Sequence, residues 1–214
     1  MNSVGGHSGI SQPRSTTKNK KNRPLRVRNR DARERALIEA AGKLFADQGY
    51  EHTTTRQIAA KAGCAEGLIS RYFQGKAGLL RKLVELQLSR KDGAPAALPP
   101  TMKEEIGRML EEEVQRFWDD REFLKMVVPQ MILDTALGRQ LQDLSERRAK
   151  GIIDRLQTYD ECKKLSADEL SALATSIIGI GSLFGFWRSV ALGHDRQHAQ
   201  QMVKAMGSVI ARAF

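Results

Sequence analysis

The stretch from Thr53 to Lys76, TTTRQIAAKAGCAEGLISRYFQGK, restricts the fold more than any other part of the sequence. Thr54 precedes Gln57 by three residues, a spacing at which the two side chains cap the start of a helix reciprocally. Gly63 follows at the point where a residue in the left-handed conformation ends such a helix and turns the chain. The stretch therefore predicts two short helices joined by a tight turn, a helix-turn-helix.

The second of these helices carries its apolar residues on one side only. Ile69 and Phe73 lie four residues apart and should hold it against the first helix. The residues expected to point outward are Glu66, Gly67, Ser70 and Arg71. Such a polar outward face suits the major groove of DNA.

Positive charge is concentrated at the same end of the chain. The formal net charge is +10 over 214 residues, and residues 1–30 contain eight Lys and Arg with no acidic residue. Residues 1–30, 31–92 and 93–214 have net charges of +8, +3 and −1. This distribution is typical of a nucleic-acid-binding protein with an electrically neutral second half.

Residues 1–30 are rich in Gly, Ser, Asn and Lys and predict a flexible basic arm, because they contain too little apolar surface to order themselves. Two interpretations stay open. The arm either contacts DNA through Arg23, Arg26, Arg28 and Arg30, as homeodomain arms do, or only makes the protein more soluble.

The helix-turn-helix stretch resembles the DNA-binding domain of TetR-family transcriptional repressors. The matching residues are Thr54, Ile58, Ala59, Ala62, Gly63, Gly67, Ile69, Phe73, Lys76 and Leu79, preceded by Leu37, Ala40, Leu44, Phe45 and Gly49. The chain departs from the family pattern at Cys64 and Ala65, where Val-Ser is usual, and at Ser70, where Tyr is frequent. The alternative is a helical hairpin in an all-helical core, which has no reason to follow this pattern or to adjoin a basic arm.

The resemblance implies which residues bind DNA. The expected contacts are Thr54, Thr55, Arg56, Glu66, Gly67, Ser70, Arg71, Tyr72 and Lys76. Among them, Thr54, Thr55, Tyr72 and Lys76 are expected at the phosphate backbone. The others should face the groove, where Arg71 suits guanine and Glu66 suits the amino group of cytosine.

The rest of the sequence predicts an all-α protein, with six prolines and few alternating β-type runs. The first helix should start near Asp31 and end before Gly49, and residues 76–90 should form a fourth, linking helix. These elements make residues 31–92 a three-helix DNA-binding domain with a linking helix. The Gly and Pro residues of 91–100 mark the boundary to a helical domain, 93–214, for dimerisation and effector binding.

Within the second domain, helices are expected at about 101–118, 121–137, 138–159, 166–192 and 195–213. Pro129 should kink or break the second of them and open space in the bundle. Leu170 to Trp187 is apolar nearly all round, which favours a buried helix over a membrane span.

A second subunit is the expected cover for that helix. The predicted interface pairs it with a stripe on the last helix, Met202, Val203, Met206, Val209 and Ile210, to form a four-helix bundle. Gly179, Gly181 and Gly185 are predicted to let the two subunits approach closely there.

The aromatic and methionine residues of this domain are candidates both for core and for pocket lining. The resemblance implies an effector pocket. The candidates chosen for it are Phe117, Trp118, Phe123, Met126, Met131, Phe184 and Trp187.

Other chemistry has little support in the sequence. Cys64 and Cys162 lack metal spacing, and His194 and His198 lie four apart without a third ligand, so no metal and no cofactor are expected. The consecutive residues Glu111, Glu112 and Glu113 are interpreted as a solvated face. No nucleophile motif or phosphate loop occurs, so an enzyme is not expected.

The sequence therefore predicts a cytoplasmic homodimer that binds double-stranded DNA and is not associated with a membrane. It should act as a repressor that a small-molecule effector releases from a palindromic operator. The alternative is a ligand-independent architectural DNA-binding protein.

Overall fold

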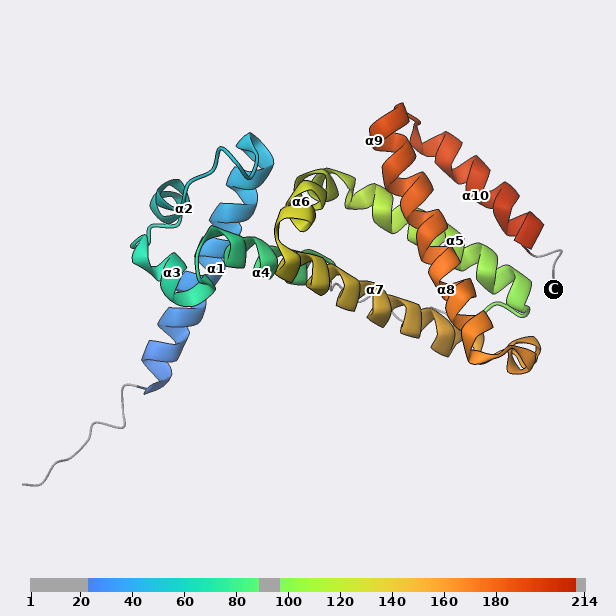
Figure 1. Ribbon diagram of the computed structural model, residues 1–214. Coiled ribbons are helices and arrows are strands. Elements are labelled where there is room, and N and C mark those ends of the chain that lie inside the picture. The colour runs from blue at the N-terminus through green and yellow to red at the C-terminus, as the bar shows by residue number, and fades with distance from the viewer. Residues whose placement is uncertain (1–22, 89–96, 211–214) are drawn as a thin grey trace, which may run out of the picture.

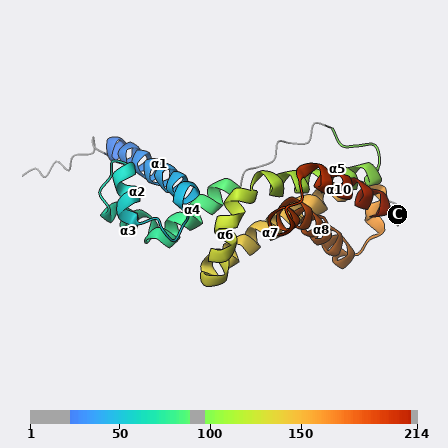
Figure 2. The same ribbon diagram turned by 90° about the horizontal axis from the view of Figure 1, so that it is seen from above.

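The computed structural model describes residues 23–88 and 97–210, and all regular elements in these two ranges are helices. Figure 1 shows two groups of helices joined end to end, with α1–α4 on one side and α5–α10 on the other. The view from above in Figure 2 shows the same elongated arrangement. The predicted all-α class, a helix-turn-helix domain followed by a helical domain, is confirmed.

The first group consists of α1 (Arg23–Gln48), α2 (Thr55–Lys61), α3 (Gly67–Phe73) and α4 (Lys76–Leu88). The expectation that the first helix starts near Asp31 is wrong, because α1 begins eight residues earlier. Pro24 lies in its first turn, where a missing N–H costs nothing, and neither Pro nor Gly follows before Gly42. The last eight residues of the predicted arm are thus helical, and residues 1–22 lie outside the described ranges.

The predicted buried stripe of α1 is confirmed by the burial of Leu37, Ala40, Ala41 and Phe45. This core continues beyond the first four helices. It takes in Val127 and Leu137, which are 0% exposed and come from the second group. The DNA-binding unit is therefore packed on the second group through shared apolar side chains.

The second group contains α5 (Met102–Asp119), α6 (Arg121–Leu133), α7 (Thr135–Leu156), a short 3-10 helix (Asp160–Lys164), α8 (Ala167–Ser182) and α10 (Arg196–Ile210). Between α8 and α10 the helical backbone continues through a π-helical turn, η3 (Leu183–Trp187), and α9 (Arg188–Leu192). Gly193 ends this run at φ 66°, as predicted for that glycine. Residues 89–96, which include most of the predicted boundary, lie outside the described ranges.

Pro129 does not break its helix. It lies inside α6, which continues to Leu133, and the chain turns at Asp134 instead. Asp134 ends α6 and caps α7, because its Oδ1 accepts hydrogen bonds from the amides of Ala136 and Leu137. The break expected at Pro129 is therefore wrong, since α6 accommodates the loss of one backbone donor, and the alternative of a kink stays a prediction.

The run from Ala167 to Leu192 has the length and composition of a membrane-spanning helix, with a mean hydropathy of 1.6. One side of it packs on α5 through Leu170, Ala174 and Ile177, which are all buried. Core helices of water-soluble proteins pass the same test of length and composition. The opposite side is exposed at Leu183 and Trp187.

Two of the three glycines predicted at a subunit interface lie inside the chain instead. A Cβ on Gly181 would lie 2.4 Å from the Cβ of Glu113, and a Cβ on Gly185 would lie 2.5 Å from the backbone oxygen of Val114. Both glycines are buried against α5, so the prediction is wrong for them. Gly179 is exposed, a Cβ added to it would meet no atom within 4 Å, and it alone keeps the predicted place.

Candidate DNA interface and effector cavity

The helix α3 presents the surface that the sequence predicted. Ile69 is 0% exposed and Phe73 is 9% exposed, and both lie in the core beneath it. Glu66, Gly67, Ser70 and Arg71 are exposed, and Tyr72 is half-buried. A short, firmly packed helix therefore carries an uninterrupted polar face.

The turn before α3 is fixed by local bonds. The predicted capping box is present, since the Gln57 amide donates to Thr54 Oγ1 over 3.2 Å and the Thr54 amide donates to Gln57 Oε1 over 2.8 Å. Gly63 has φ 61°, the left-handed value predicted for it. The capping box thus fixes the start of α2, and the turn into α3 is closed by bonds from the backbone amides of Gly63 and Cys64 to the backbone oxygens of Ala60 and Ala59.

The two helices are also joined by side chains. The hydroxyl of Thr55 donates to Glu66 Oε1 over 2.5 Å. In the free protein, Glu66 thus accepts a bond from α2 at the position from which it was predicted to accept from cytosine. Arg56 is exposed beside this pair.

Lys76 has a structural task besides its predicted phosphate contact. Its Nζ donates to the backbone oxygens of Tyr50 and Thr53 at 2.9 and 3.0 Å and lies 4.2 Å from the centre of the Tyr50 ring. The ammonium therefore ties the start of α4 to the turn between α1 and α2. One of its three N–H groups remains for a phosphate.

Sequence reasoning missed a contact between α1 and α3. The guanidinium of Arg30 lies 5.2 Å from the centre of the Tyr72 ring, and its Nε donates to Glu34 over 2.7 Å. The amino-terminal part of α1 thus runs beside the predicted DNA-reading helix. The signal was Pro24, which suits a helix start better than an arm.

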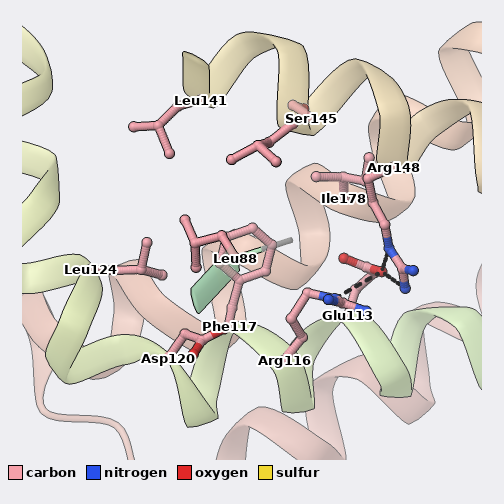
Figure 3. A pocket seen from close by; sticks show the side chains of 11 residues that line it. Leu88, Glu113, Arg116, Phe117, Asp120, Leu124, Leu141, Ser145, Arg148 and Ile178 are labelled. Carbon is pink, nitrogen blue, oxygen red and sulfur yellow. Dashed lines mark hydrogen bonds and ion pairs between the residues drawn. The ribbon is translucent and has the colours of Figure 1, made fainter. Parts of the chain in front are cut away.

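A cavity of about 230 Å³ lies in the second group, below the end of α4. Its apolar walls come from α4, α5, α6, α7 and α8. The lining residues are Leu88, Glu113, Arg116, Phe117, Asp120, Leu124, Leu141, Leu144, Ser145, Arg148 and Ile178. Figure 3 shows the leucines and Phe117 at one end and the charged side chains of Glu113, Arg116 and Arg148 at the other.

Glu113 is the buried charge of this cavity, with 1% of its surface exposed. Its Oε1 accepts a hydrogen bond from Arg148 Nε at 2.5 Å and lies 3.6 Å from Arg116 Nε. The interpretation of residues 111–113 as a solvated face is therefore wrong for Glu113. An inward position follows from the spacing of the buried residues Ile106, Met109 and Leu110, which continues to 113.

Of the seven residues predicted to line an effector pocket, only Phe117 lines this cavity. Phe123 and Met126 pack on the core of the DNA-binding unit, and Phe184 belongs to the core of the second group. Trp187 is 49% exposed, and Trp118 stacks with Arg121 at 4.7 Å. Met131 is half-buried near Gly138.

The side chains of His194 and His198 lie together, with ring centres 4.3 Å apart. His194 Nδ1 accepts a bond from Arg188 Nε over 3.3 Å. No group of three or more His, Cys, Asp or Glu residues with metal-binding geometry occurs in the described ranges 23–88 and 97–210.

Comparison with known proteins agrees with these features. The family model of the bacterial regulatory proteins of the tetR family matches residues 37–83, which cover α2, α3, the carboxyl-terminal part of α1 and most of α4. The chain is 27% identical over 170 residues to the HTH-type transcriptional regulator BetI of Pectobacterium carotovorum, covering 76% of this chain and 84% of BetI. It is 46% identical over 50 residues to the HTH-type transcriptional regulator HbdR of an Aromatoleum species, covering 23% and 22% of the two chains.

Residues 37–83 of the chain form a DNA-binding domain of the TetR family of transcriptional regulators.

Solved structures support the fold of this TetR-family regulator over about 85% of its length. A protein of Syntrophomonas wolfei described as a TetR-family transcriptional regulator aligns with a TM-score of 0.64 and 16% identity, over 85% of this chain and 95% of that one. The flavonoid-responsive regulator FrrA aligns with a TM-score of 0.62 and 20% identity, over 85% and 95%. The TetR-family regulator therefore shares both its helix-turn-helix and its second helical group with these proteins.

Proposed function

We propose that this TetR-family regulator is a cytoplasmic homodimeric repressor that a small-molecule effector releases from a palindromic operator. The observation that carries the proposal is the pairing of an exposed polar face on α3 with a lined cavity below the end of α4. A ligand-independent architectural protein has no use for such a cavity. The relatives BetI and HbdR are transcriptional regulators, and FrrA is described as flavonoid-responsive.

The division of DNA contacts is the one that the family resemblance implies. Arg56, Gly67, Ser70 and Arg71 are exposed and are assigned to the groove together with Glu66. Thr54, Thr55, Tyr72 and Lys76 are assigned to the phosphates. For Glu66 to accept from a base, it has to share or release its bond to Thr55.

The dimer interface is assigned to the exposed side of α8, η3, α9 and α10. The large apolar side chains exposed there are Leu183, Trp187, Val190, Leu192, Met202 and Val209. Val203 of the predicted stripe is 1% exposed and belongs to the core of its own chain. Exposed apolar residues on consecutive elements, η3, α9 and α10, favour an interface between subunits.

Release is assigned to the contacts between α4 and the second group. Leu88 at the end of α4 lines the cavity, and Gln87 donates to Asp120 Oδ1 over 2.9 Å. About two turns earlier in α4, Arg81 pairs with Asp134 over 2.7 Å, and Gln140 donates to the backbone oxygen of Arg81 over 2.9 Å. A ligand in the cavity therefore meets α4 directly, and a shift of α4 changes the separation of the two α3 helices.

The proposal is tested by titrating the complex of the protein with its operator against small-molecule extracts. Operator DNA is obtained first by selection from a random pool. We expect a fraction that releases the wild-type protein and fails to release Ser145→Phe, because Ser145 is exposed on α7 and lines the cavity. A fraction that releases both proteins equally contradicts the assignment of the cavity as the effector site.

A further inference from the structure

The second carboxylate oxygen of Glu113 is a buried hydrogen-bond acceptor in the cavity. Oε2 is buried, and no hydrogen-bond partner for it occurs among the described residues. Figure 3 shows the oxygen turned away from Arg148, on the side of Phe117 and Leu88. A buried acceptor without a partner is costly, so a ligand that donates to Oε2 gains more than it would from an ordinary surface acceptor.

The charges around this atom restrict the ligand further. Oε1 of Glu113 is already neutralised by Arg148 and approached by Arg116, and Asp120 accepts from Gln87. Among the lining residues that the structure describes, the acidic pair Glu113 and Asp120 balances the basic pair Arg116 and Arg148 in formal charge. Binding of a charged ligand would give this apolar space a net charge, which is costly to bury. Binding of a neutral ligand would not.

The remaining walls determine the body of the ligand. Leucines, Ile178, Phe117 and Ser145 form the rest of the lining, which is apolar except for the serine hydroxyl. The volume of about 230 Å³ lies below the range of roughly 300–1,000 Å³ that drug-sized ligands occupy. The body is therefore small and apolar.

We infer that the cavity takes a small, neutral, apolar molecule with one hydroxyl group, and that this hydroxyl donates to Glu113 Oε2. The inference rests on the proposed function only in treating the cavity as the effector site. Glu113 is thus the residue that selects alcohols and phenols over hydrocarbons, amines and carboxylates of the same shape.

The test uses probes that share one apolar body. Benzyl alcohol, toluene, benzylamine, benzoate and acetophenone are titrated into the full-length protein without DNA, and Kd is measured by nuclear magnetic resonance. We expect benzyl alcohol to bind roughly tenfold or more tightly than toluene, as a hydrogen bond to a charged group implies. Benzylamine and benzoate should bind more weakly than benzyl alcohol. Equal binding of toluene, or tighter binding of either charged probe, overturns the inference.

A substitution of Glu113 tests its role as the acceptor independently. In Glu113→Gln the amide oxygen should face Arg148, so that its NH₂ group faces the cavity as a donor. The preference should then reverse, with acetophenone binding more tightly than benzyl alcohol. A variant that folds and keeps the alcohol preference overturns the role of Glu113.

If Glu113→Gln does not fold, titration of the five probes into the wild-type protein and into Ser145→Phe still tests the inference. Ser145→Phe should lose binding of benzyl alcohol because it fills the cavity mouth, and unchanged binding overturns the site. The proposed function is tested separately by operator release. If benzyl alcohol binds selectively but does not release the protein from DNA, only the effector role of the cavity is contradicted. If compounds of another class compete with benzyl alcohol and release the wild-type protein from DNA, only the inferred ligand class is overturned.

Discussion

Lys76 is expected to contribute to stability and to phosphate binding, and Arg71 to base recognition. Lys76→Met should lower the free energy of unfolding by roughly 1–3 kcal/mol, because it removes two charged hydrogen bonds to backbone oxygens. It should also weaken binding to all DNA sequences alike. Arg71→Ala should leave stability within about 0.5 kcal/mol and lose roughly 1–3 kcal/mol of discrimination at one base pair.

These effects are measured by urea unfolding and by binding to operator variants. Lys61→Met is the matched control for Lys76→Met, since Lys61 is partly exposed and lies 3.9 Å from its partner Asp47. It should change the free energy of unfolding by less than about 1 kcal/mol. Loss of base preference in Lys76→Met, with preference intact in Arg71→Ala, would mean that the roles are assigned the wrong way round.

Asp134 predicts a pH dependence at the joint between the two helical groups. Burial raises its pKa, but the amide of Leu137 and the Arg81 guanidinium lower it more, so the net pKa lies below the ordinary value of 3.8. A lowered pKa means that the folded state prefers the carboxylate. The contribution to stability is therefore complete above about pH 4 and is lost as pH falls through the folded pKa.

Asp134→Asn tests this dependence, because asparagine keeps the cap of α7 and loses the charge. At pH 7 the variant should be less stable than the wild type by about 1 kcal/mol or less, as expected for a partly exposed pair. The difference should shrink below pH 4 in denaturation curves recorded at several pH values. A difference that grows with acidity would show that the carboxylate is not the favoured form.

At the scale of elements, the packing of α8 on α5 depends on glycine. Gly181→Ala should lower the free energy of unfolding by roughly 1–3 kcal/mol, because its Cβ meets the Cβ of Glu113 and the α5 backbone. Gly151→Ala on exposed α7 is the control, since no atom lies within 4 Å of its Cβ, and it should raise stability by about 0.5–1 kcal/mol. Thermal unfolding of both variants measures the contrast, and equal effects would contradict the close approach.

The basic segment before α1 gives a second prediction at this scale. Deletion of residues 1–22 removes Arg14, Lys18, Lys20 and Lys21 without cutting α1, which starts at Arg23. For every phosphate that these side chains neutralise, the deletion should reduce the slope of log affinity against log salt by about 0.9. Base preference should survive in the truncated protein, and an unchanged slope would show that these residues do not contact DNA.

The sequence predicted local structure well because local chemistry determines it. The capping box at Thr54, the turn at Gly63 and the inward positions of Ile69 and Phe73 depend on neighbours within a few residues. Glu113, Gly181 and Gly185 depend on which helix packs against which, and a helix pattern alone does not state that. They share a spacing of three or four with the buried residues of their own helices, which was the available signal.

The cavity was harder to predict for the same reason. Its lining comes from five helices, and large aromatic residues such as Phe184 fill the core instead. Leucines and a paired carboxylate form most of its walls, and neither residue type marks a pocket in a sequence. Only Phe117 was recognised.

For the whole molecule, Trp187→Arg tests the assigned dimer interface. The substitution places a charge on an exposed apolar side chain and should convert dimers to monomers in sedimentation experiments. Ile132→Arg is the matched control, since Ile132 is 76% exposed and lies on α6, outside the elements assigned to the interface. Dimers that persist in Trp187→Arg, or monomers in Ile132→Arg, would move the interface elsewhere.

The central claim is that two α3 helices, held by the dimer, read a palindrome. Selection of bound duplexes from a random pool tests it most directly, with wild type, Arg71→Ala and Trp187→Arg in parallel. The account predicts an inverted repeat whose half-sites lie about one DNA turn or slightly more apart, the same spacing with one relaxed base position for Arg71→Ala, and no repeat for Trp187→Arg. Enrichment of a single half-site by the wild type, or of no sequence at all, would contradict it.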